Sequence, residues 1–429
     1  MLFKNISIID ENFECQNNMF LATKDNIIAY IGKEKPSEDF GREYDGTGKV
    51  IIPGLYNSHA HAPMSILRGY AENLPLSEWL NNRIFPFEAK MVGEDIYNGA
   101  LLSFAEGLKF GTVSSTEMYY WGEYLGRAVE ESGIKCNISL SVLCFDNSSL
   151  YDLPIYKENE TIIPKLHKSS NGRLKVDLSL HAEYTSTPKV VSEMAQYAKQ
   201  KALNMHIHLS ETKAEVEGCK QRHNGQTPAE YFNSLGIFDV PTTAAHCVWL
   251  QKNDFDILKE KGVTAVNCPI SNLKLASGFC NVKKLLDNGV NIALGTDSAA
   301  SNNNLNLFEE LKLFATLYKA TNYDATAITP QQALRCATLN GAISQGRENC
   351  GKIKVGNCAD IVVINTDSPN MQPIHNMLNN IVYSLSSDDI LLTMVDGEVL
   401  YENGEYTKLD IEKIIFNANE STKKILKQL

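Results

Sequence analysis

Two histidines separated by a single residue follow a short apolar run and a Pro-Gly turn. The run covers residues 50–52, the turn is Pro53-Gly54, and the histidines are His59 and His61. On extended backbone, side chains two positions apart point to the same side of the strand. Two imidazoles that share a direction supply half of a metal site. The motif alone is equally consistent with two histidines that share no function. The rest of the chain must decide between this interpretation and a metal site.

The composition argues against several classes of partner. The chain has 429 residues, of which 43% are hydrophobic, and its net charge is −11. An acidic chain disfavours a nucleic-acid partner and an anionic membrane surface. No apolar run approaches the roughly 18 residues that span a bilayer, and the N-terminus lacks the pattern of a signal peptide. We therefore expect a cytoplasmic protein without a membrane partner.

The predicted secondary structure changes in character three times along the chain. Residues 1–52 consist of short strand-like runs, and residues 53–349 alternate between about eight strands and the helices that follow them. Strand-like runs, including residues 381–384, return in residues 350–405, and residues 406–429 form an amphipathic helix. The pattern predicts an α/β fold, a (β/α)8 TIM-like barrel with a small β-sandwich domain formed by both chain termini. A doubly wound open sheet is the alternative, but no glycine-rich nucleotide loop follows a first strand.

Polar residues end several of the predicted barrel strands. Active sites of such barrels lie at the carboxyl ends of the strands, so these residues should meet in one place. The set comprises His59, His61, His181, His206, His208, His246 and Asp297. So many potential ligands at strand ends exceed what chance placement would give.

Three neutral imidazoles and one carboxylate suit one Zn²⁺ ion per subunit, with Fe²⁺ as the alternative, better than Mg²⁺ or Ca²⁺. Such a site keeps a positive charge, which lowers the pKa of bound water toward ~7. We predict His208 as a ligand because it lies nearer the strand end than His206, which we predict to be packed inside the barrel. Glu211 follows His208 by three residues and is placed to move protons without binding the metal.

Several segments resemble the signatures of the amidohydrolase superfamily. They occur in the same order as in that family, and the resemblance covers nearly the whole chain. They are residues 53–63, 208–212, 245–247, 295–303 and 359–362. Within the superfamily the sequence is most similar to the 5'-methylthioadenosine/S-adenosylhomocysteine deaminases, with chlorohydrolase-like and guanine deaminase-like members as close relatives.

The resemblance implies a mononuclear site and a division of roles around it. Glu211 would carry protons to the ring nitrogen and the leaving amine, His246 would orient the hydroxide, and Asp297 would take a proton from water. The implied metal ligands are His59, His61, His208 and Asp297.

Two further implications concern the number of metals and the substrate. Dinuclear members place a carboxylated lysine at the end of strand four, where this chain has His181, while Lys175 begins that strand. Trp79 resembles the tryptophan that packs on the ligand, and Glu88 resembles the glutamate that accepts hydrogen bonds from ribose hydroxyls. His181 resembles the histidine that touches the nucleoside.

The chain departs from the family in one segment. Members that accept S-adenosylhomocysteine carry arginines after strand three, but residues 137–153 contain none and include Asp146 and Asp152. We therefore expect a deaminase of adenosine, 5'-deoxyadenosine or 5'-methylthioadenosine, with S-adenosylhomocysteine less favoured. The alternatives are a deaminase of guanine or another heterocycle, a chlorohydrolase, and a catalytically silent scaffold, although scaffolds usually lose ligands that this chain retains. The sequence is compatible with a homo-oligomer.

Overall fold

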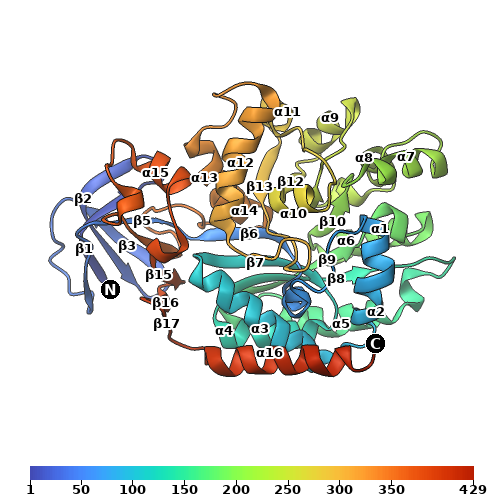
Figure 1. The fold of residues 1–429 in the computed structure, drawn as a ribbon, viewed down its shortest axis with the longest axis horizontal. Helices are drawn as coiled ribbons and strands as arrows, with labels where there is room; N and C mark the ends of the chain where they lie inside the picture. The colour runs from blue at the N-terminus through green and yellow to red at the C-terminus, as the bar shows by residue number, and fades with distance from the viewer.

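The computed structural model describes all 429 residues, which build two separate sheets (Figure 1). The larger body is an eight-stranded sheet in which each strand is parallel to its neighbour and the spatial order follows the sequence. Its strands are β6 (Leu55–Ala60), β7 (Thr112–Tyr119), β8 (Lys135–Val142), β9 (Leu174–Leu180), β10 (Met205–Leu209), β11 (Thr242–His246), β12 (Thr264–Asn267) and β13 (Asn291–Leu294). The predicted (β/α)8 architecture is confirmed.

Helices surround this barrel and connect its strands. They include α3 (Gly93–Lys109), α4 (Gly122–Ser132), α5 (Pro154–Leu166), α6 (Pro188–Lys201), α7 (Lys213–Arg222), α8 (Pro228–Ser234), α9 (Lys252–Glu260), α10 (Pro269–Lys274), α11 (Val282–Asp287), α12 (Leu307–Asn322), α13 (Pro330–Ala337) and α14 (Leu339–Ser344). Threonines cap the N-termini of two of them, because the Thr187 side chain accepts from the backbone N–H of the third residue of α6 and Thr329 does the same for α13. None of the helices has both the length and the apolar character needed to cross a membrane.

The first and last strands of the barrel meet where β13 ends beside β6. The Asp297 N–H donates to the His59 carbonyl (3.0 Å), and the Asn57 side chain bonds both the Thr296 N–H (3.0 Å) and the Thr296 hydroxyl (2.8 Å). Gly295 is required at this junction, because a Cβ there would lie 2.8 Å from the His59 carbonyl oxygen. The junction therefore places Asp297 directly beside the His-x-His segment.

Strands from both ends of the chain form the second sheet, at the left of Figure 1. Here β5 of the N-terminal segment pairs antiparallel with β14 of the C-terminal segment, with Ile51 opposite Val363. Both side chains are buried in the apolar core of this sheet. Its strands are β1 (Leu2–Ile9), β2 (Cys15–Lys24), β3 (Ile27–Gly32), β4 (Glu43–Asp45), β5 (Lys49–Pro53), β14 (Ile361–Asn365), β15 (Ile390–Val395), β16 (Glu398–Glu402) and β17 (Glu405–Tyr406).

One predicted strand in the C-terminal segment is wrong. Residues 381–383 belong to helix α15 (Met377–Tyr383) and Ser384 is its C-cap, while the N-cap Asn376 accepts from the Asn379 N–H (3.1 Å). The β-branched, apolar run suggested a strand, but Ile381 and Val382 instead form the buried face of this helix. The hairpin of β15 and β16 turns at Asp396-Gly397, where both residues have positive φ, as a tight hairpin turn requires.

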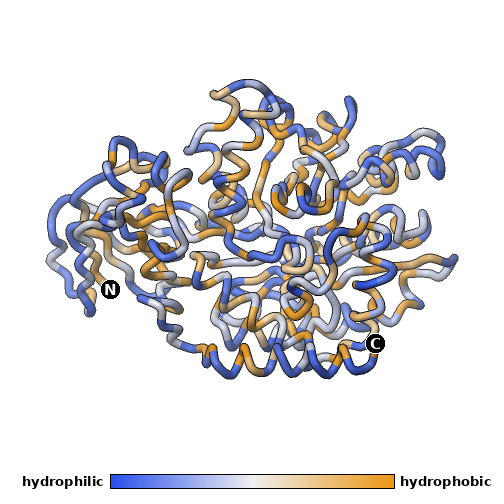
Figure 2. Tube along the Cα trace, viewed as in Figure 1, coloured by the Kyte–Doolittle hydropathy of each residue, from blue (hydrophilic) through white to orange (hydrophobic).

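The C-terminal helix α16 (Ile411–Leu426) packs against the outside of the barrel, below α3 in Figure 1. Its trace alternates between hydrophobic and hydrophilic residues (Figure 2), and its buried residues Ile414, Ala418 and Ile425 recur at helical spacing. The Asn98 side chain of α3 donates to the Ser421 hydroxyl (3.1 Å).

A buried charge cluster joins the barrel to the terminal sheet. The ammonium of Lys135, at the start of β8, contacts Asp360 (2.5 and 2.7 Å) and Asp396 (2.7 Å), and Asp360 also accepts from the Tyr56 hydroxyl. The Lys135 side chain is only 4% exposed. Breaking one member of a buried pair leaves its partner charged and without compensation, which is strongly destabilising.

We therefore expect Lys135→Met to lower the free energy of unfolding by about 3 kcal/mol or more. The matched control is Lys165→Met, which removes an exposed pair with Glu123 and should cost less than about 1 kcal/mol. Urea unfolding monitored by circular dichroism measures both values. Equal losses in the two variants would show that Lys135 does not fasten the sheets together.

Candidate active site

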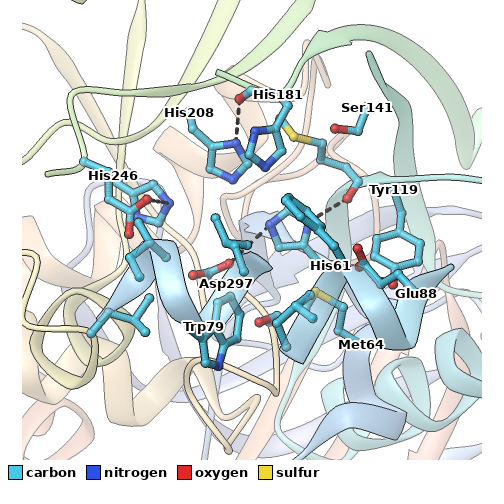
Figure 3. Close-up of a pocket in the computed structure, with 18 of the residues that line it drawn as sticks. His61, Met64, Trp79, Glu88, Tyr119, Ser141, His181, His208, His246 and Asp297 are labelled. Carbon is cyan, nitrogen blue, oxygen red and sulfur yellow. Dashed lines mark hydrogen bonds and ion pairs between the residues drawn. The ribbon is translucent and has the colours of Figure 1, made fainter. Parts of the chain in front are cut away.

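The predicted strand-end residues gather around one cavity at the carboxyl ends of the barrel strands (Figure 3). The cavity encloses about 620 Å³ of space not filled by protein, its open mouth included. Residues His61, His181, His208, Glu211, His246 and Asp297 all line it. His59 lies beneath them, fully buried, and His206 lies deeper inside the barrel, also fully buried.

The ring orientation of two histidines is set by backbone carbonyls. The Nδ1 of His61 lies 2.6 Å from the Met118 carbonyl oxygen, and the Nδ1 of His208 lies 2.7 Å from the His181 carbonyl oxygen. A carbonyl accepts only, so each Nδ1 carries a proton, and in the neutral ring each Nε2 keeps its lone pair. Such an arrangement of the second ring nitrogen is typical of metal-ligating histidines.

A chain of side chains sets the orientation of His59 in the same way. His59 Nδ1 lies 2.9 Å from His206 Nε2, and His206 Nδ1 lies 3.3 Å from the Ser139 hydroxyl, which itself donates to the Glu117 carbonyl (2.8 Å). Because Ser139 donates onward, the protons along this chain point away from the cavity. The His59 Nε2 atom is left with its lone pair toward the site, buried and without a hydrogen-bond partner.

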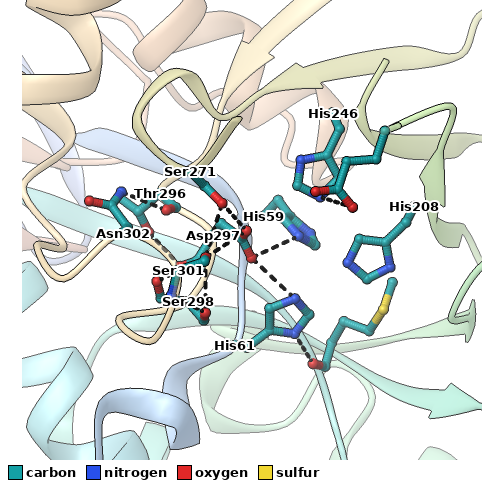
Figure 4. Close-up of polar contacts among 12 residues, drawn as sticks. His59, His61, His208, His246, Ser271, Thr296, Asp297, Ser298, Ser301 and Asn302 are labelled. Atoms are coloured by element: carbon teal, nitrogen blue, oxygen red, sulfur yellow. Dashed lines mark hydrogen bonds and ion pairs between the residues drawn. The ribbon is translucent and has the colours of Figure 1, made fainter. Parts of the chain in front are cut away.

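Asp297 completes the group of donor atoms (Figure 4). Its Oδ1 lies 3.3 Å from His61 Nε2 and 3.5 Å from His59 Nε2, while its Oδ2 accepts from the Ser271 hydroxyl (2.6 Å) and the Ser301 hydroxyl (2.9 Å). Burial alone would raise the pKa of Asp297, but His59 and His61 hold it well below its usual range, and the carboxylate in turn raises the pKa of His61 despite the burial of that ring. A carboxylate is therefore present among the nitrogen donors.

These donors fit a divalent cation. The ligand atoms of His59, His61 and His208 lie within 4.8 Å of one another, as do those of His59, His246 and Asp297. Burial lowers the pKa of His59 to about 4 and that of His208 well below its usual value, so both rings are neutral near pH 7. Neutral imidazoles with free lone pairs, an ionised carboxylate and an unpartnered buried nitrogen form the donor set that Zn²⁺ prefers.

Glu211 and His246 lie together at one side of these donors. Glu211 Oε2 is 3.8 Å from His246 Nε2, and burial raises the pKa of the Glu211 carboxyl. A carboxyl whose pKa is raised holds a proton more readily than an exposed carboxyl does. Both groups can therefore exchange protons with a molecule in the cavity.

The three predicted substrate residues also line this cavity. Trp79 ends α1 (Leu76–Trp79) and Glu88 ends α2 (Phe85–Glu88), and a π-helical turn, η2 (Leu80–Ile84), joins the two short helices. The Trp79 indole N–H donates to the Ala71 carbonyl (3.1 Å), which fixes the ring. Glu88 accepts from the Tyr119 hydroxyl (2.6 Å), and burial raises its pKa to about 7. His181 lies on the opposite wall (Figure 3).

Several residues that hold the site together escaped the sequence analysis. Glu215 accepts from the Ser210 N–H (2.8 Å) and the Glu211 N–H (2.7 Å), and the Thr-x-x-Glu spacing of Thr212 and Glu215 is a capping-box signal that could have identified it. Tyr119 beside Glu88 carries no such signal, because the contact joins segments far apart in the chain.

Comparisons with known proteins agree with this geometry. Residues 50–400 match the amidohydrolase family. A 5-methylthioadenosine/S-adenosylhomocysteine deaminase of Thermoanaerobacter pseudethanolicus is 40% identical over 435 residues, which cover 100% of both chains. A 5'-deoxyadenosine deaminase of Methanothermobacter thermautotrophicus is 40% identical over 398 residues, which cover 93% of this chain and 92% of the other.

The crystal structure of an adenosine deaminase from Xanthomonas campestris with bound zinc shares the fold throughout. Its TM-score is 0.91 at 28% identity, and the match covers 99% of this chain and 98% of that one. The resemblance drawn from the sequence motifs is confirmed by these matches, which extend over both sheets and the cavity. The chain belongs to the amidohydrolase family.

Proposed function

We propose that this protein is a metal-dependent aminohydrolase that converts an adenosine-type nucleoside to the inosine analogue and ammonia. The observation that carries the proposal is the convergence of His59, His61, His208 and Asp297 beside Glu211, in a cavity that also presents Trp79 and Glu88. Relatives named as deaminases of 5-methylthioadenosine, S-adenosylhomocysteine and 5'-deoxyadenosine at 40% identity support the same reaction.

A divalent metal is supported by the family and by its zinc-containing member of known structure. We propose Zn²⁺, with Fe²⁺ as the alternative, held by His59, His61, His208 and Asp297. Such a cation lowers the pKa of a water molecule toward ~7 and so supplies a hydroxide nucleophile near neutral pH. One ion per chain is favoured because Lys175 lies at the opposite end of β9, where its ammonium contacts the Gly346 carbonyl (2.6 Å).

Two separate variants, one at the proposed ligand His208 and one at nearby Glu211, should distinguish metal binding from proton transfer. We expect His208→Ala to lose most of its metal, because one of three nitrogen donors is gone. Glu211→Gln should retain one ion per chain but lose about 10²- to 10⁴-fold in kcat, the range for a positioned acid-base group. Metal analysis and ammonia release on zinc-loaded protein measure both effects. An active Glu211→Gln variant, or one that loses metal as His208→Ala does, would contradict these roles.

The side chains around the cavity account for the proton movements of deamination. Addition of hydroxide at C6 requires a proton at N1, and breaking the C6–N6 bond requires a second proton at the amine. Glu211 would deliver both, because it lines the cavity 3.8 Å from His246 Nε2 and burial raises its pKa. His246 Nε2 and the Asp297 carboxylate face the same space and would orient the nucleophile and accept its proton. Glu88 would accept hydrogen bonds from the ribose, and Trp79 and His181 would contact the nucleoside.

An outer pocket at the mouth of the cavity supports a small or neutral 5' group. The two pockets share wall residues Leu76, Leu80, Phe85, Tyr184 and Leu275. The cationic residues of the outer pocket, Arg222 and Lys274, are already paired with Glu183 and Glu72. A substrate carboxylate would therefore find no free cation there, which agrees with the absence of arginine in residues 137–153.

The deciding experiment is ammonia release by the zinc-loaded protein with adenosine, 5'-deoxyadenosine, 5'-methylthioadenosine, S-adenosylhomocysteine and guanine. We expect kcat/KM to be at least about tenfold higher for the three uncharged adenosine substrates than for S-adenosylhomocysteine, because a zwitterionic amino-acid group lacks a partner. Turnover of guanine alone would overturn the roles of Trp79 and Glu88, and turnover of no substrate would overturn the proposed reaction.

The raised pKa of Glu88 gives substrate binding a pH dependence. Above pH 7 the carboxyl is ionised and accepts ribose hydroxyls, and below pH 7 it is protonated and accepts them less well. We expect the KM for adenosine-type substrates to rise about tenfold from pH 8 to pH 6. In Glu88→Gln the KM should be high at both pH values, while the exposed neighbour variant Glu78→Gln should behave as the native protein. A native pH profile in Glu88→Gln would rule out this role.

A further inference from the structure

Strand β12 contributes no residue to the predicted site, yet the segment after it contacts three predicted catalytic residues. This segment, residues 268–278, comprises Cys268, α10 (Pro269–Lys274) and the four residues that follow. Three of its buried side chains each hydrogen-bond a different partner: Ser271 bonds Asp297, Asn272 bonds His246 and Ser277 bonds Glu211. These partners are the groups to which the proposed reaction assigns proton transfer.

The contact between Asn272 and His246 determines where the imidazole carries its proton. The Oδ1 of Asn272 lies 2.9 Å from His246 Nδ1. An amide oxygen only accepts, so Nδ1 is the protonated nitrogen and Nε2 presents a lone pair toward the cavity. Glu211 Oε2 lies 3.8 Å from that Nε2 atom. In the other tautomer the Nε2 atom could not accept a proton.

Ser277 fixes the second partner, Glu211. Its hydroxyl donates to Glu211 Oε1 (3.1 Å), which directs Oε2 toward His246. The backbone of Ser277 is itself held from both sides, because its N–H donates to the Asn272 carbonyl (2.8 Å) and its carbonyl accepts from the Trp249 indole (2.6 Å). Asn272 and Ser277 therefore move as one unit.

The beginning of the segment is tied to the barrel at a separate point. The Ile270 N–H donates to Glu310 Oε2 (3.1 Å), and the Ser271 hydroxyl donates to Asp297 Oδ2 (2.6 Å). Glu310 and Ser271 are both completely buried. With anchors at both ends, the segment is held rigidly against the three groups it contacts.

We propose that residues 268–278 are a positioning device for proton transfer, in which Asn272 selects the tautomer of His246 and Ser277 aims the carboxyl of Glu211. Ser271 holds Asp297 at the same time. None of the three needs to touch the substrate, so each acts through its partner. The kinetic part of this inference rests on the proposed function, whereas the tautomer of His246 does not.

The first test is nitrogen NMR of the zinc-loaded protein labelled with ¹⁵N-histidine, with the His246 signals assigned from their absence in His246→Gln. We expect the Nδ1–H tautomer in the native protein and in Asn272→Asp, whose carboxylate also accepts. Asn272→Ala should show a mixture of the two neutral tautomers. An Nε2–H tautomer in the native protein, or an unchanged spectrum in Asn272→Ala, would overturn the proposal whatever the substrate is.

The second test separates positioning from structural damage by kinetics on the best substrate. We expect Asn272→Ala and Ser277→Ala to lower kcat by about 10- to 100-fold, the usual effect of such supporting contacts, with KM within about twofold and metal content unchanged. Ser277→Thr keeps the hydroxyl and should retain most of the activity. Leu273→Ala, an exposed position in the same segment, should behave as the native protein.

Two kinetic outcomes would contradict the proposed positioning role of residues 268–278. Equal losses in Ser277→Thr and Ser277→Ala would show that the hydroxyl is not what matters. A loss confined to KM would show that the segment serves binding, not proton transfer. If the native protein deaminates none of the nucleosides, the proposed function fails by itself, and the NMR result still decides the role of Asn272.

Discussion

The contact between the ends of β13 and β6 closes the barrel and assembles the site in the same step. The Asp297 N–H donates to the His59 carbonyl, while the Asp297 carboxylate lies 3.3 to 3.5 Å from the Nε2 atoms of His61 and His59. Gly295 allows this approach because the His59 backbone leaves no room for a Cβ. Any displacement of β13 would therefore separate the carboxylate from the imidazoles as well as open the barrel, so fold and site depend on one junction.

The imidazoles around this junction have different hydrogen-bond partners, but in each of them the same ring nitrogen makes the bond. Backbone carbonyls orient His61 and His208, His206 orients His59, and a side-chain amide orients His246. In each case the bonded nitrogen is Nδ1, which leaves Nε2 toward the cavity. Burial lowers the pKa of His59, His206 and His208 and keeps these three rings uncharged, whereas the Asp297 carboxylate raises the pKa of His61. A cluster of neutral rings avoids mutual repulsion and retains the lone pairs that a cation needs.

The sequence predicted those features that are local, and it missed those that join distant segments. Histidines that end apolar strands are visible in any linear reading, because strand geometry fixes where the next side chain points. The roles of Asn272 and Ser277 depend on partners 26 and 66 residues away, and no spacing rule connects them. The misassigned residues 381–384 illustrate the same limit, since the β-branched Ile381 and Val382 favour a strand in isolation, whereas the Asn376 cap and burial of these two side chains make residues 381–383 helical.

The separation between donor atoms and substrate residues suggests how specificity is built. The proposed metal ligands come from the ends of β6, β10 and β13, which the barrel holds rigidly. Trp79 and Glu88 come instead from one insertion between η1 (Ala62–Leu67) and α3, whose π-helical turn sets the angle between its two short helices. Residues of that insertion also form the wall shared by the inner and outer pockets. Changes within it would alter which nucleoside fits without moving a ligand, so the reaction and the choice of substrate are carried by different parts of the fold.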